Sequence, residues 1–170
     1  MVFIRLKKRS YKSGENFYAY LVGNKWENNT SKQEIKRYIG RYIKLDSNKN
    51  SEIKINEVKT IKKKDILLYL LKKQLLSYDF KEKVKHLFIH KAGFSVNLKN
   101  NKVLNKKTNK KICLGLNNGF LCSHTLKKLS EFKTPKDKKK TGIKLIKLFL
   151  DLGINTNKEL FLEIFNKFID

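Results

Sequence analysis

The fold is decided by residues 16–45, which read NFYAYLVGNKWENNTSKQEIKRYIGRYIKL. Aromatic and β-branched residues, which favour strands, fill two runs within this stretch, residues 16–26 and 33–45. A third run of the same character, residues 2–9, precedes them, and turn-forming residues separate all three runs. Because consecutive strands joined by short turns pair antiparallel, we predict a three-stranded antiparallel meander that forms a basic unit over residues 1–47.

The predicted strands gather tyrosines on one face, because successive side chains of a strand point to opposite faces. Alternation places Tyr18 and Tyr20 on one face of the second strand, and Tyr38 and Tyr42 on one face of the third. Such a face could stack bases, as the sheet platforms of several RNA-binding proteins do. The alternative is that the rings cover a helix, because a three-stranded meander needs a second layer to be stable.

The rest of the chain predicts a second, α+β unit over residues 61–170. Residues 46–60 are polar and lack a clear period, which is typical of a linker or a loop with one weak strand. Apolar residues at helical spacing predict a central helix over 61–80, and short strand-like segments between Asn-rich turns predict a basic β-ribbon over 86–123. Apolar helical patterns in 124–170 predict C-terminal helices. The predicted fold class is therefore α+β, with meander, central helix, basic β-ribbon and C-terminal helical hairpin in that order.

Capping residues predict where the C-terminal helices begin and end. Ser123 is a candidate N-cap for one helix and Thr141 for the next, so that residues 136–140 form a charged loop. Gly153 suits the C-terminal cap of the second of these helices. The last two helices superficially resemble a helix-turn-helix, but the second begins with acidic and apolar residues, which indicates a packing hairpin.

Charge is abundant and unevenly distributed along the chain. Its 170 residues include 40 Lys and Arg against 15 Asp and Glu, which gives a net charge of +25 at pH 7. Residues 86–123 hold lysines and no acid, no acidic residue occurs between Glu82 and Glu131, and residues 141–170 are neutral overall. A long stretch without acid indicates a surface that attracts phosphates, so we expect a polyanionic partner. The alternative is a Lys-rich surface that only keeps the protein soluble.

The lysines near the predicted turns of the ribbon have no role in a core, and phosphate contact is their favoured use. Only four of the basic residues are Arg, which argues against the reading of base edges, where Arg dominates. The predicted nucleic-acid-binding residues are Arg5, Lys7, Lys8, Arg9, Tyr18, Tyr20, Lys36, Arg37, Tyr38, Arg41, Tyr42, Lys99, Lys102, Lys106, Lys107, Lys110 and Lys111.

The sequence contains no recognisable catalytic or metal-binding pattern. It lacks the short motifs of phosphate-binding loops, serine hydrolases and zinc proteases. Cys113, Cys122 and His124 have a spacing that does not fit a zinc finger or ribbon, so we expect two reduced, metal-free thiols. No apolar run approaches the roughly 18 residues of a membrane span, and no secretory signal is evident. We therefore expect a cytoplasmic protein without catalytic residues, cofactor, metal or membrane partner.

Several segments resemble other sequences. FIRLKK at residues 3–8, YAYLV at 18–22, KW at 25–26 and KRYIGR at 36–41 are similar to segments of small basic archaeal proteins of unassigned role, and so is the region 119–155. The N-terminal strands also resemble the N-terminal strand regions of some DDE transposases. That resemblance implies contact with DNA, although no acidic triad follows in this sequence.

These features predict a non-catalytic protein that binds nucleic acid, with RNA favoured over DNA. The expected partner is structured RNA, and a ribosomal or ribosome-associated role, with ribosomal proteins as further partners, fits the size and charge. One alternative is a DNA-binding or chromatin-type protein related to the DNA-contacting region of a transposase. Another is a protein-interaction adaptor whose charge results only from compositional drift.

Overall fold

The computed structural model describes residues 2–12, 14–27, 30–47 and 53–169. The mixed helix-and-strand character that the sequence predicts is confirmed. Parts of the turns predicted between the first three strands, residues 13 and 28–29, lie outside the described residues, as does part of the predicted linker. The elements are β1 (Val2–Tyr11), β2 (Gly14–Glu27), β3 (Thr30–Lys44), α1 (Ile55–Thr60), η1 (Lys63–Asp65), α2 (Ile66–Ser77), β4 (Phe80–Val84), β5 (Leu87–His90), β6 (Phe94–Asn97), β7 (Lys102–Asn105), β8 (Lys110–Leu116), β9 (Gly119–Leu121), α3 (Ser123–Ser130), α4 (Lys138–Leu152) and α5 (Lys158–Ile169).

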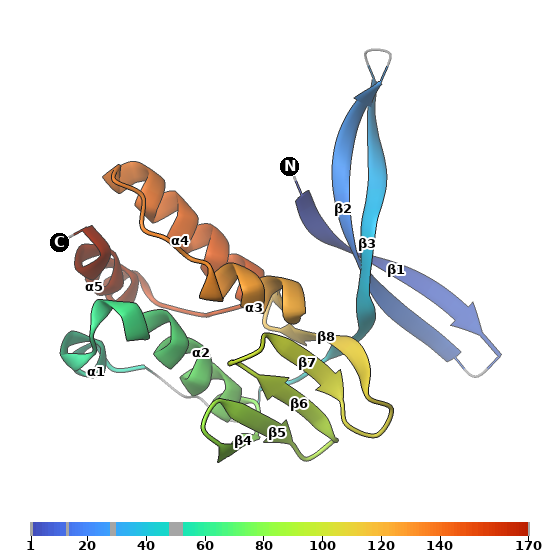
Figure 1. Cartoon of the computed structure of the whole chain (residues 1–170), viewed down its shortest axis with the longest axis horizontal. Helices are drawn as coiled ribbons and strands as arrows, with labels where there is room; N and C mark the ends of the chain where they lie inside the picture. The colour runs from blue at the N-terminus through green and yellow to red at the C-terminus, as the bar shows by residue number, and fades with distance from the viewer. Residues whose placement is uncertain (1, 13, 28–29, 48–52, 170) are drawn as a thin grey trace.

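The strands form one continuous sheet in the order β1-β2-β3-β8-β7-β6-β5-β4, with β9 paired to β8 (Figure 1). β3 and β8 run parallel, with Arg41 opposite Ile112 and Lys44 opposite Gly115, whereas the other pairs are antiparallel. This short parallel ladder joins two parts of the molecule. We refer to β1–β3 as the N-terminal sheet and to residues 53–169 as the body.

The N-terminal sheet projects from the body (Figure 1). β1 pairs with β2 from Tyr11 opposite Gly14 to Val2 opposite Gly23, and it ends there. β2 and β3 continue to pair with each other as far as Glu27 opposite Thr30. The hairpin beyond Gly23 is therefore a two-stranded ribbon, which we call the arm.

One large apolar core holds the body together. α2 buries Leu70, Leu71 and Leu75 against Phe88 of β5, while the C-terminal helices contribute residues such as Leu145 to the same cluster. Burial of apolar area of this extent is the dominant stabilising contribution in a domain of this size. Within the described residues, none of the helices combines the length and the apolar character that a membrane span requires.

A second, much smaller cluster lies where the N-terminal sheet meets the body. Ala19 and Ile39 of the N-terminal sheet are buried against Cys113 of β8 and Cys122, which directly follows β9. Tyr42 packs partly buried against the same cluster. The N-terminal sheet is thus anchored on one side by a few small side chains and by the parallel ladder.

The structure corrects several predicted limits of helices. The described residues of the predicted linker in 46–60 contain the helix α1 and no strand, and residues 48–52 lie outside the described residues. The single helix predicted over 61–80 is divided into η1 and α2, and β4 begins at Phe80, because Asp79 adopts a left-handed conformation (φ 59°) that ends the helix.

The capping predictions were correct at one of three positions. α4 begins at Lys138 and not at Thr141, because the Asp137 side chain accepts a hydrogen bond from the Lys140 amide at 2.7 Å. α3 is capped by Cys122, not by Ser123, in a capping box with Thr125. Gly153 does cap α4, in a left-handed conformation (φ 67°) with the Leu116 carbonyl so close that a Cβ atom would clash with it.

Candidate nucleic-acid interface

The register of the N-terminal sheet assigns each side chain to one of two faces, because residues opposite each other on paired strands share a face. Tyr20 lies opposite both Arg5 and Tyr38, and Tyr18 lies opposite both Lys7 and Arg41. We call the face that holds these residues the outer face and the opposite one, which buries Ala19 on the body, the inner face. The outer face comprises Phe3, Arg5, Lys7, Arg9, Tyr11, Asn16, Tyr18, Tyr20, Val22, Asn24, Trp26, Gln33, Ile35, Tyr38 and Arg41.

Three tyrosines form a cluster on the outer face. The ring centroid of Tyr38 lies 5.4 Å from that of Tyr20 and 6.3 Å from that of Tyr18, and the rings are tilted. Such tilted contacts are the favoured geometry of aromatic pairs. Tyr38 is 51% exposed, whereas Tyr18 and Tyr20 are half-buried. The cluster therefore presents one open ring that is supported by two others.

Cations from β1 lie over the two supporting rings. The Lys7 Nζ is 5.7 Å from the centroid of Tyr20, and the Arg9 Cζ is 5.4 Å from the centroid of Tyr18. Arg9 also donates a hydrogen bond to the Tyr20 hydroxyl at 3.2 Å. A hydrogen bond with Tyr11 raises the pKa of Arg9, and burial raises the pKa of Tyr38, so the guanidinium is charged and the phenol neutral at physiological pH.

Charge is segregated between the two faces. Glu15, Glu27 and Glu34, the acidic residues of these strands, all lie on the inner face by register. Each pairs there with lysine: Glu15 with Lys8, Glu27 with Lys25 and Lys32, and Glu34 with Lys36.

The cations of the outer face have neutral partners instead. Arg5 donates to Gln33, and Arg41 donates to Asn16. Among the described residues, no carboxylate pairs with Arg5, Lys7, Arg9 or Arg41. The outer face therefore keeps its full positive charge, which polyanions are attracted to.

The predicted meander residues divide between the two faces. The outer face brings together Arg5, Lys7, Arg9, Tyr18, Tyr20, Tyr38 and Arg41, whereas Lys8, Lys36, Arg37 and Tyr42 lie on the inner face. The predicted grouping of Tyr42 with the other tyrosines is wrong. Tyr20 is opposite Tyr38 and Ala19 is opposite Gly40, so Ile39 is an extra residue in β3, a β-bulge. Because of this extra residue, the side chains of β3 beyond Ile39 point to the face opposite to the one that strict alternation predicts.

The six ribbon lysines do not form a single basic tip. Lys99 and Lys102 lie at the turn between β6 and β7, whereas Lys106, Lys107, Lys110 and Lys111 lie at the turn between β7 and β8. Antiparallel strands place these turns at opposite ends of β7, which spans only Lys102–Asn105, about 10 Å. All six are exposed, so they provide two smaller basic surfaces on the body.

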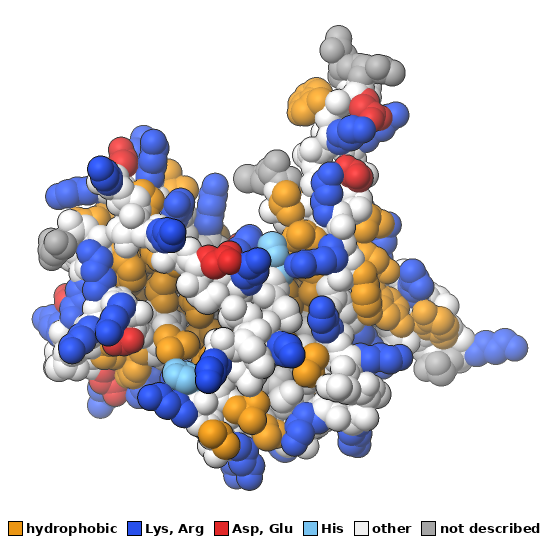
Figure 2. Space-filling model, in the orientation of Figure 1, with side chains coloured by type: hydrophobic (Ala, Val, Ile, Leu, Met, Phe, Trp, Pro, Cys, Tyr) orange, Lys and Arg blue, Asp and Glu red, His pale blue; other side chains and the backbone are white. Residues whose placement is uncertain are grey.

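The prediction missed three exposed aromatic residues on the outer face, Phe3, Tyr11 and Trp26. Trp26 is 73% exposed on the arm, and Tyr11 approaches the Tyr18 hydroxyl with its own hydroxyl at 3.4 Å. Strict alternation along β2 would have placed Trp26 on the same face as Tyr18 and Tyr20, so the signal was available in the sequence. Figure 2 shows hydrophobic side chains interleaved with Lys and Arg over the N-terminal sheet.

The two cysteines lie side by side beneath the inner face. The β8–β9 register pairs Leu114 with Leu121, so Cys113 and Cys122 occupy the next opposing positions, and both are free and fully buried. The contact with Cys122 and burial raise the pKa of Cys113, which is therefore a protonated, unreactive thiol at neutral pH. Among the described residues, no three His, Cys, Asp or Glu side chains group as metal ligands would.

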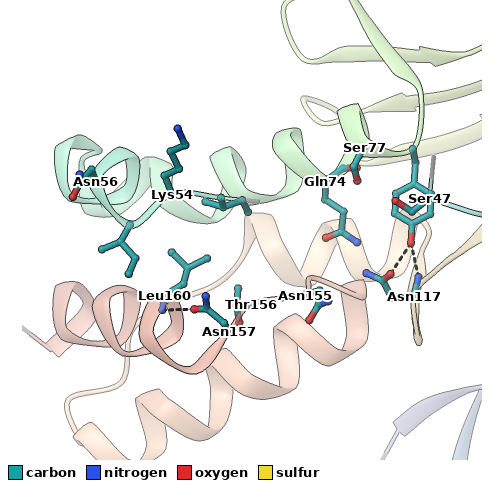
Figure 3. Close-up of a pocket in the computed structure, with 13 residues that line it drawn as sticks. Ser47, Lys54, Asn56, Gln74, Ser77, Asn117, Asn155, Thr156, Asn157 and Leu160 are labelled. Atoms are coloured by element: carbon teal, nitrogen blue, oxygen red, sulfur yellow. Dashed lines mark hydrogen bonds between the residues drawn. The ribbon is translucent and has the colours of Figure 1, made fainter. Parts of the chain in front are cut away.

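A pocket of the body, about 840 Å³ in volume, has a lining rich in amides and hydroxyls that also includes Lys54 (Figure 3). It lies between α1, the end of α2 and the start of α5. The Tyr78 hydroxyl accepts a hydrogen bond from the Asn117 amide and donates one to the Asn117 side chain, each at 2.8 Å. The described lining contains no Asp, Glu, His or Cys, and its titratable side chains are Lys54 and Tyr78.

Comparisons with protein-family models, with curated proteins and with solved structures found no match to this chain.

Proposed function

We propose that the protein is a non-catalytic nucleic-acid-binding protein that contacts its partner through the outer face of the N-terminal sheet and prefers RNA to DNA. The observation that carries this proposal is the segregation of charge in that sheet. The inner face neutralises its own carboxylates, while the outer face combines four cations with exposed aromatic rings.

The chemistry of the outer face matches both parts of a nucleotide. Phosphates are bound by Lys and Arg, and their binding releases condensed counterions from the nucleic acid. Bases have flat π-faces, which stack on aromatic side chains and on guanidinium planes. The core of a protein–protein interface is depleted of charged residues, whereas the outer face has Lys and Arg between its rings.

RNA is favoured for two reasons. Sequence-specific and structured RNA is recognised largely through shape and through unpaired bases that stack on sheet platforms. DNA readout in the major groove relies mainly on Arg, and the chain has only four, three of which lie on the outer face beside rings. A structured RNA, such as that of a ribosome, offers loops and phosphates together.

The two lysine turns of the body supply additional phosphate contacts. Lys99 and Lys102 at one end of β7, and Lys106 to Lys111 at the other, are exposed and carry no ion pair with a described carboxylate. Their flexible ammonium groups act as point charges, which hold a backbone without reading its sequence.

The test compares two variants of equal net charge. One replaces Arg5, Lys7, Arg9 and Arg41 of the outer face by Gln, and the other replaces Lys8, Lys25, Lys32 and Lys36 of the inner face by Gln. The affinity for a fluorescein-labelled RNA hairpin is measured by anisotropy as a function of salt. Four phosphate contacts contribute about −3 to the slope of the logarithm of the binding constant against the logarithm of the salt concentration. The outer-face variant should therefore make this slope less negative by about 3, whereas the inner-face variant should leave it unchanged.

Three results would contradict the proposal. Equal losses for both variants would mean that net charge, and not the outer face, determines binding. Tighter binding of a DNA duplex with a preference for base sequence would favour the DNA-binding alternative. Binding weaker than millimolar to RNA and DNA at physiological salt would leave the adaptor alternative.

A further inference from the structure

The tyrosine cluster has features that a contact with phosphates alone does not require. The Tyr38 ring is half exposed, and Tyr18 and Tyr20 hold it from one side. Its hydroxyl makes no hydrogen bond to another described residue. A ring that is held in place loses little conformational freedom when a ligand binds to its open side.

We infer that the outer face holds an unpaired stretch of nucleic acid, with one base stacked on Tyr38 and a second aromatic contact at Trp26. This inference rests on the proposed function and names the form of its partner. In a duplex, both faces of each base are covered by neighbouring bases, so a ring on a sheet can reach only backbone and groove edges. An open ring contributes to binding only when a base is unstacked and can lie on it.

Cations lie on two sides of the tyrosine cluster, where the phosphates that flank a stacked base would lie. Arg9 and Lys7 lie over Tyr18 and Tyr20, so Tyr38 is left as the accessible platform, and the two charges lie on the rings that contact it. Arg41 lies opposite Tyr18 on the other side of the cluster. Phosphates on both sides of a base stacked on Tyr38 would therefore meet a cation within the same face.

Trp26 extends this face along the arm. It lies six residues beyond Tyr20 on the same side of β2, which corresponds to about 20 Å along the strand. At 73% exposure, its indole is more open than the exposed rings of Phe3, Tyr11, Phe17 and Tyr38. A single strand that runs along the paired strands β2 and β3 from Tyr38 to Trp26 would contact both rings, and single-strand-binding folds commonly hold 4 to 16 nucleotides per site.

The experiment compares single-stranded and fully paired probes. We measure the affinities of the full chain for a 12-nucleotide single-stranded RNA and for a blunt RNA duplex of the same length. Tyr38→Ala should weaken single-strand binding roughly 5-fold to 150-fold, the value of one stacked base, and should leave duplex binding unchanged. Tyr38→Phe, which keeps the ring, should recover most of the lost affinity.

Phe17→Ala is the matched control. Phe17 is a 40% exposed aromatic residue on the inner face of the neighbouring strand β2, so its removal changes a similar exposed area without touching the outer face. It should leave the affinity for the single strand unchanged. Thermal unfolding of each variant verifies that the fold is retained, which the exposure of both rings leads us to expect.

Trp26 supplies an independent readout, because it is the only tryptophan in the chain. Its fluorescence should be quenched when the single strand binds and should not change with the duplex. If both probes bind equally and Tyr38→Ala has no effect, the inference is wrong while the proposed function stands. If neither probe binds, the proposed function itself fails. Binding with a Tyr38 effect but without quenching would remove Trp26 from the site.

Discussion

The N-terminal sheet and the body differ in how many of their apolar side chains are buried in a core. In the body, apolar side chains from α2, the strands and the C-terminal helices converge on one core. Among the described residues of the N-terminal sheet, the buried apolar residues are Ala19, Val22 and Ile39, and Ala19 and Ile39 lie against two cysteines of the body. The sheet therefore depends on the body for stability, and its outer face is free to carry function.

The largest expected effect is a loss of stability on the body side of this comparison. Phe88 is fully buried in the large core, so Phe88→Ala should lower the free energy of unfolding by about 3–5 kcal/mol. Tyr38→Ala, at an exposed position, should change it by less than about 0.5 kcal/mol. Urea unfolding measures both. Similar losses for the two variants would show that the N-terminal sheet contributes to stability as the body does.

The next effect tests the junction between the two regions. A Cβ atom at Gly40 would lie 2.5 Å from the Lys111 carbonyl oxygen, so Gly40→Ala must push β3 away from β8. We expect a cost of about 1–3 kcal/mol. Hydrogen exchange measured by mass spectrometry should show faster exchange in β1–β3 while α2 stays protected. Uniformly faster exchange would mean that the two regions unfold as one unit.

Local patterns in the sequence predict much of the outer face. β2 pairs with β1 without a register shift from Gly14 to Gly23, and the predicted placement of Tyr18 and Tyr20 on one face is correct there. Tyr42 could not be placed correctly, because the bulge at Ile39 occurs where Gly40 meets Lys111 of β8. That contact joins residues far apart in the chain, and no local pattern contains it.

The body shows the same limit. Asn101 and Asn109 adopt left-handed conformations at the two turns that flank β7, as Asn often does, and both turns were predicted from Asn-rich segments. The sequence pattern did not reveal that the lysines around them lie at opposite ends of β7. The start of α4 was missed although Asp137 is a good N-cap, because Thr141 competed for that role in the sequence.

A smaller effect separates the two regions by their response to acid. His90 lies between Phe80 and Phe94, with ring centroids at 5.0 and 5.7 Å, and its Nδ1 accepts a hydrogen bond from the Ala92 amide. Burial lowers the pKa of His90, and Lys91 adds to this while Asp79 opposes it. The stability that a neutral His90 contributes is present above the unfolded pKa of about 6.5 and is lost as pH falls below that value.

The free energy of unfolding should therefore decrease between pH 7 and pH 5, and His90→Asn, which keeps an acceptor for Ala92, should make this decrease smaller. Binding of RNA should not follow the same curve, since the titratable side chains of the outer face are all Arg, Lys or Tyr and the outer face contains no histidine. An affinity that changes with pH in step with stability would indicate that a histidine of the body takes part in binding.

The smallest expected effect concerns the C-terminal helices of the body. Lys144 on α4 and Lys158 at the start of α5 are exposed, in a region whose charges balance. Replacing both by Gln should change the affinity for RNA by less than about twofold and leave the salt slope unchanged, because only ions in contact with phosphate are exchanged for counterions. The double variant Lys7→Gln, Arg9→Gln removes the same charge from the outer face and should flatten the slope by about 1.4. Equal slopes for the two double variants would show that charge on the body acts on the nucleic acid as strongly as charge on the outer face, and the functional difference between the two regions would disappear.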